Sequence, residues 1–93
     1  MDQNQEITPE QMQQILTSGT IPQVYFNGFA TGVSTGDINL TLMLNGRPVL
    51  ILNASYTVAK TLSQKLKVAI DLVETKNSFE IKTIDELTKG LKP

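Results

Sequence analysis

The chain has 93 residues and a formal net charge of −1, and it contains neither cysteine nor histidine. Its length suits one domain with a small core, and its near-neutral charge gives no overall field that attracts nucleic acid or an acidic membrane. Disulfides, thiolate metal sites and imidazole-based catalysis are excluded. Because we find no signal-peptide pattern and no apolar run long enough to span a membrane, we expect a cytoplasmic protein. We also expect no cofactor.

A short helix is predicted to follow residues 1–7, which are polar and expected to form a flexible tail. Thr8 can cap this helix, Pro9 suits its first position, and Gln11 completes a capping box. Gly19 is expected to end it in a left-handed conformation. The apolar stripe of the helix is narrow and consists of Met12, Ile15 and Leu16. Such a short helix needs a surface to dock on.

The next part of the chain predicts an antiparallel meander of three strands. Strand formers are frequent from Ile21 to Phe29, and residues 38–44 alternate between apolar and polar. Asn45-Gly46 predicts a type I′ turn, after which residues 47–52 form the return strand. The strand formers expected in the first strand are Val24, Tyr25, Phe26 and Phe29.

The return strand raises the question of what covers its second face. Residues 49–52 read Val-Leu-Ile-Leu, so both faces of this strand are apolar. We expect one face of the sheet to meet a long helix through Ile38, Leu40, Leu42 and Leu44. We predict that Met43, Leu50 and Leu52 form the other face and the interface with a second copy, in a two-fold dimer. The alternative is that the N-terminal helix folds back over this face within one chain.

A long helix is predicted from Tyr56 to about Lys76, with Ser55 as its cap. Residues 79–82 alternate and predict a short fourth strand, and Thr83 begins a second capping box and a final helix. The stripe of the long helix contains Val58, Leu62, Leu66, Ala69 and Val73. The chain is therefore predicted to be one α+β domain, residues 8–93 with a core at about 21–76. In it, a three- to four-stranded antiparallel meander is packed by one long C-terminal helix, with short helical segments at both ends.

Few residues indicate chemistry. Asp37 lies at a turn, where side-chain capping explains it, and Glu74 is expected on the solvated face of the long helix. Since no nucleophile can be paired with a general base, we do not expect an enzyme. Without histidine or cysteine, we also expect no metal site. The candidate contacts for a ligand or nucleic acid are Arg47 and Tyr25 in the sheet region and Lys60, which lies beside free amides at a helix start. Because the sheet region contains only one cation, Arg47, we expect a protein partner rather than nucleic acid.

Four parts of the sequence occur in a distinctive order: Tyr25-Phe26-Asn27, Gly36-Asp37-Ile38, Ser55 to Leu62, and Glu74. This order resembles a bacterial family catalogued as domain of unknown function 3467. That family has a first strand that carries an Asn, an acid in a turn before an apolar strand, and a Ser-x-x-x-Ala-Lys-x-Leu helix with a Glu towards its end. The likeness spans about residues 22–76. It implies a small oligomeric α+β domain and brings no known activity.

The order of strands followed by a C-terminal helix is also similar, more distantly, to the Whirly and transcriptional-coactivator type of single-strand DNA binder. That likeness implies a dimer that binds DNA through basic and aromatic residues on its sheet. Because the second sheet face is apolar and no nucleophile pairs with a base, we predict a non-enzymatic self-associating module that binds a macromolecular partner or assembles with copies of itself. The alternative is a single-stranded nucleic-acid-binding protein.

Overall fold

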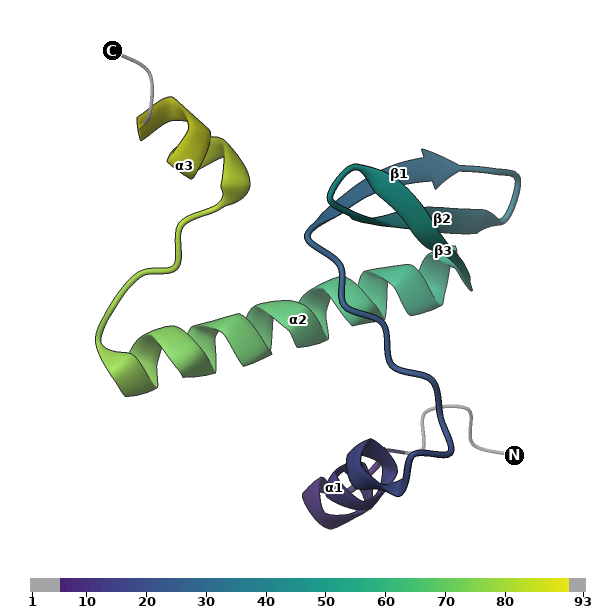
Figure 1. Ribbon diagram of the computed structural model, residues 1–93, viewed down its shortest axis with the longest axis horizontal. Coiled ribbons are helices and arrows are strands. Elements are labelled where there is room, and N and C mark those ends of the chain that lie inside the picture. The colour runs from purple at the N-terminus through teal and green to yellow at the C-terminus, as the bar shows by residue number, and fades with distance from the viewer. Residues whose placement is uncertain (1–5, 91–93) are drawn as a thin grey trace.

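The computed structural model describes residues 6–90, which form three helices and three strands (Figure 1). In chain order these are α1 (Pro9–Ser18), β1 (Gly28–Val33), β2 (Asp37–Leu44), β3 (Arg47–Ser55), α2 (Tyr56–Asn77) and α3 (Ile84–Gly90). The predicted α+β class is confirmed, with α2 as the longest helix and a shorter helix on either side. Most of the predicted tail at residues 1–7 lies outside the described residues.

All three helices begin at the predicted caps. The hydroxyl of each cap accepts a hydrogen bond from a backbone N–H three residues later, which satisfies one of the free donors at a helix start. The pairs are Thr8 with Gln11 at 3.1 Å, Ser55 with Val58 at 3.2 Å and Thr83 with Glu86 at 3.1 Å. Gly19 ends α1 with a φ of 73°, as predicted.

The sheet is a meander with strand order β1-β2-β3, antiparallel throughout. Asn45 and Gly46 connect β2 to β3 with φ values of 53° and 83°, which agrees with the predicted type I′ turn. The pairing shifts by one residue between Leu42 and Met43, so β3 contains a bulge.

The register corrects the prediction about the faces of the sheet. Leu50 is opposite Leu42 and Leu52 is opposite Leu40, and directly opposed residues share a face. Met43 lies on the other face, because neighbours along a strand alternate. The prediction that Met43, Leu50 and Leu52 form one surface away from the long helix is therefore wrong. An arm that is apolar at every position contains no alternation from which its register can be predicted.

Two segments predicted as strand are not strand. The first strand starts at Gly28 rather than near Ile21, in agreement with the missing amide proton of Pro22. Residues 79–82 connect α2 to α3 without pairing, so the described part of the chain has three strands. These residues follow α2, whose 22 residues extend about 33 Å. The helix therefore takes them away from their own sheet (Figure 1).

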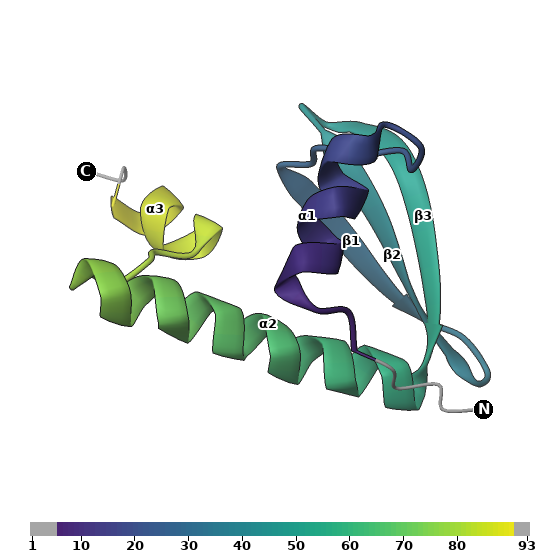
Figure 2. The ribbon, with the colours of Figure 1, turned by 90° about the horizontal axis from the view of Figure 1, so that it is seen from below.

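The elements pack sparsely. Leu42, with 6% of its surface exposed, is the one buried hydrophobic residue of the described chain. The first turns of α2 lie against β2 and β3, whereas neither α1 nor α3 packs on another described element (Figures 1 and 2). The N-terminal helix therefore does not cover the sheet of its own chain. The radius of gyration is 16.1 Å, compared with about 12 Å for a compact chain of this length.

Candidate interaction surface

An uncovered apolar surface runs from the sheet along α2. Leu50 and Leu52 lie on the helix side of the sheet, yet 40% and 43% of their surfaces are exposed. Along α2, the exposed fraction is 53% for Leu66 and 43% for Val73. We call the following residues the open apolar surface: Leu50, Leu52, Leu62, Leu66, Ile70 and Val73.

The length of α2 explains why this surface is open. A cavity of about 230 Å³ is lined by Leu40 and Leu52 of the sheet and by Ala59 and Leu62 of α2. The sheet contacts only the first part of the helix (Figure 2). The rest of α2 continues past the sheet (Figure 2). Burial of one large apolar side chain is worth about 1.5–3 kcal/mol, and the side chains of this stripe lack much of that stabilisation within the described chain.

Tyr56 fixes the direction in which α2 leaves the sheet. Its hydroxyl donates a hydrogen bond to the carbonyl of Ser34 and accepts one from the backbone N–H of Gly36 at 3.1 Å. Both partners belong to the turn between β1 and β2, which lies at the end of the sheet where β3 leads into α2, so the first residue of α2 is tied to that turn. This role could not be predicted from the sequence, because the contact joins residues about twenty positions apart.

Asn27 closes the opposite end of the sheet. Its side-chain amide donates to Oδ1 of Asn45 at 2.9 Å, and its Oδ1 accepts from the backbone N–H of Asn45 at 2.9 Å. The backbone N–H of Asn27 also donates to the carbonyl of Met43 at 3.0 Å. These bonds hold the β2–β3 turn against the segment before β1. The family resemblance marks Asn27, but it does not indicate this role.

Glu74 is bound to the chain that follows α2, which contradicts its predicted place on a solvated face. Its Oε2 accepts from the backbone N–H of Ile81 at 2.8 Å, and its carbonyl accepts from that of Phe79 at 3.2 Å. Its side chain is half-buried. Glu74 therefore holds the start of the connection to α3 against the end of α2.

Asp37 acts through its backbone. Its carbonyl accepts from the N–H of Ser34 at 2.8 Å and its N–H donates to the Ser34 carbonyl at 3.4 Å. Gly36 completes this turn with a φ of 91°. No hydrogen bond of the Asp37 side chain occurs within residues 6–90, so the predicted side-chain cap is absent there.

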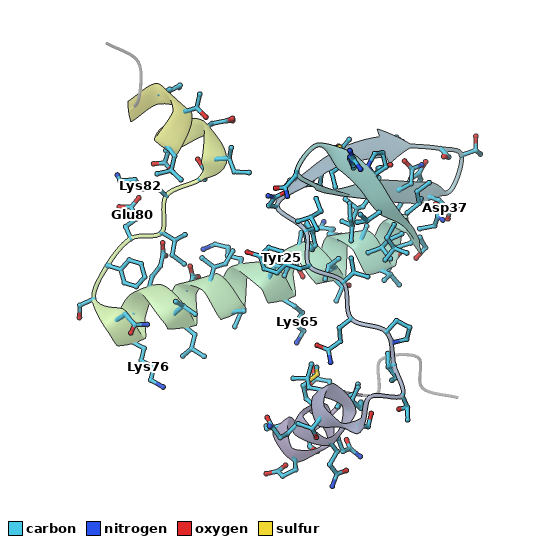
Figure 3. The ribbon with its side chains drawn as sticks, viewed as in Figure 1. Tyr25, Asp37, Lys65, Lys76, Glu80 and Lys82 are labelled. Atoms are coloured by element: carbon cyan, nitrogen blue, oxygen red, sulfur yellow. The ribbon has the colours of Figure 1, made fainter. Side chains whose placement is uncertain are left out.

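The three candidate ligand contacts come from different elements. Arg47 begins β3 and Lys60 lies in the second turn of α2. Tyr25, which is 79% exposed, precedes β1 (Figure 3). No ion pair in the described chain includes Arg47 or Lys60. Between residues 21 and 55, Arg47 is the only cation and Asp37 the only acid, so these strands offer no basic track for a phosphate backbone.

The described residues contain no group of three or more acidic side chains placed to hold a metal ion. None of the helices among residues 6–90 has both the length and the hydropathy required to cross a membrane.

A hollow of about 540 Å³ beside α1 is lined by one carboxylate, Glu6, which forms an ion pair of 3.0 Å with Lys65. The hollow thus lacks a second acid for general acid–base catalysis.

No protein-family model, curated protein or solved structure matches the chain. Both family resemblances therefore stay predictions. The open apolar surface and the residues that hold it in place are the features of the described chain that bear on its function.

Proposed function

We propose that this chain is a non-enzymatic, self-associating module that forms a homodimer through the open apolar surface. The observation that carries the proposal is its accessible surface of 8519 Å². A compact monomer of 10.2 kDa exposes about 5,300 Å². The excess is roughly 3,000 Å², whereas each partner in a standard interface buries about 800 Å². An excess of this size is typical of chains that fold with their partner.

The order of residues along α2 supports an antiparallel pair of helices. Leu66, Ala69, Ile70 and Val73 have spacings of three, one and three, which read the same in both directions. A two-fold axis can therefore place Leu66 opposite the partner's Val73 and Ala69 opposite the partner's Ile70. The antiparallel direction also keeps the two sheets at opposite ends of the helix pair, so that they do not compete for space.

We place this dimer in the cytoplasm. The chain contains no cysteine, so its stability does not depend on disulfides, which a reducing compartment would break. A further macromolecular partner would bind the assembled form. The strands offer little support for the alternative function, single-strand DNA binding. The strands contribute one cation, Arg47, and counterion release from a single cation provides little binding energy.

The proposal is tested by light scattering on the full-length chain at low micromolar concentration, in low and in high salt. We expect a mass of two chains that does not fall with salt, since apolar contacts are not screened. A mass of 10.2 kDa at every concentration would overturn the proposal. Dissociation in high salt would show that charge holds the dimer and would overturn the apolar interface.

A further inference from the structure

Residues 79–82 have the pattern of a strand but pair with no strand in their own chain. Phe79 and Ile81 are apolar and alternate with Glu80 and Lys82. The backbone N–H groups of Phe79 and Ile81 both donate to Glu74. In a strand formed by these residues, successive amides would point to opposite sides, so those of Glu80 and Lys82 would lie on the side away from the bond between Ile81 and Glu74. They have no acceptor among residues 6–90.

The sheet has a matching vacancy at β3. This strand has nine residues and pairs with β2 on one side only. Proteins usually protect such an edge with charges, proline or a short strand. In β3 the charge and the proline, Arg47 and Pro48, lie at its start, and the following four residues are apolar. The other edge strand, β1, has six residues, two of them glycine.

The two features lie too far apart to meet within one chain. The start of α2 adjoins β3, and residues 79–82 follow the other end of that helix (Figure 1). Glu80 and Lys82 lie well away from the sheet that contains Asp37 (Figure 3). In an antiparallel helix pair, however, the end of one α2 lies beside the start of the other. The partner's residues 79–82 are then next to the sheet.

We propose that residues 79–82 of each chain add as a fourth strand to the free edge of the partner's β3. This inference rests on the proposed dimer and specifies how its two copies interlock. Glu74 is the positioning residue, because it holds one edge of the segment and leaves the amides of Glu80 and Lys82 for the partner. The strand pattern that the sequence shows at residues 79–82 is then used between chains.

Amide hydrogen exchange measured by NMR on the full-length chain, above and below its dissociation concentration, tests this proposal. In the dimer we expect the amides of Glu80 and Lys82, and those of β3 that do not bond β2, to exchange at least about tenfold more slowly. The amides on the outer edge of β1 serve as the internal control and should not change.

Light scattering on the same samples separates the possible failures. A monomer at every concentration overturns both the dimer and the strand exchange. A dimer in which residues 79–82 exchange as in the monomer overturns the strand exchange alone. Protection that appears on β1 instead of β3 overturns the assignment of the edge.

A second measurement tests the role of Glu74. Glu74→Ala removes the acceptor for Ile81, whereas Glu74→Gln keeps a carbonyl oxygen in its place. We expect Glu74→Ala to raise the dimer dissociation constant about tenfold and to remove the protection of Glu80 and Lys82. Glu74→Gln should retain both. Unchanged protection in Glu74→Ala would overturn the positioning role.

Discussion

Asn27 and Asn45 form a reciprocal pair, with two hydrogen bonds of 2.9 Å between them. A net contribution of about 0.5–1.5 kcal/mol for each bond makes this pair one of the larger local terms in a thinly packed chain. We expect Asn27→Ala to lower the free energy of unfolding by about 1–2 kcal/mol. Urea unfolding should show the loss as a lower midpoint with an unchanged slope.

Asn53→Ala is the matched control for this substitution. Asn53 also lies in the sheet, but its side chain forms no hydrogen bond with another described residue. At equal protein concentration its midpoint should shift by less than about 0.5 kcal/mol. Equal losses in the two variants would mean that the Asn27–Asn45 pair contributes nothing specific.

For single residues, the sequence separation between hydrogen-bond partners decided which roles could be predicted. Thr8, Ser55 and Thr83 cap helices through partners three residues away, so a local pattern was sufficient. Asn27 and Tyr56 bond partners about twenty residues away, and no local pattern encodes such pairs. The family resemblance pointed to Asn27 and Glu74 as positions, but their contacts required the folded chain.

Among the elements, α3 has a start that depends on pH. The backbone N–H and hydroxyl of Thr83 hold the pKa of the Glu86 carboxyl below its ordinary value. The ionised carboxylate therefore stabilises the helix above the ordinary pKa of about 4.3, and this support is lost as pH falls through the lower folded value. The backbone NMR chemical shifts of α3 should stay constant near neutral pH and should report a loss of helix below about pH 4. Glu86→Gln, which keeps an acceptor, should not show this transition.

On α2, the stripe beyond the sheet should control assembly. Ile70→Glu places a charge in the proposed helix pair twice, once from each chain. The loss of about 1.5–3 kcal/mol of burial per side chain should raise the dimer dissociation constant at least about 100-fold. Gln64→Glu adds the same charge on the opposite side of the helix and should leave it unchanged. Sedimentation velocity measures both, and an intact Ile70→Glu dimer would contradict the helix pairing.

The elements also differ in how well their sequence predicts them. Over 22 residues, the period of α2 leaves no doubt about its type or about its apolar side. The Val49–Leu52 arm has no polar residue to mark a side, so its face was predicted wrongly. Residues 79–82 have a strand pattern without a partner in reach, and a pattern specifies a strand only where an edge is available to pair with.

At the scale of the whole molecule, residues 6–90 contain one buried hydrophobic residue, whereas apolar burial is the main favourable term in folding. Folding should therefore be coupled to association. For a dimer that dissociates as it unfolds, each tenfold increase in protein concentration adds about 1.4 kcal/mol of apparent stability. Circular dichroism at two concentrations should thus show a higher urea midpoint in the more concentrated sample. Ile70→Glu should lower the midpoint at both concentrations, and a midpoint independent of concentration in the unsubstituted chain would mean that the monomer folds alone.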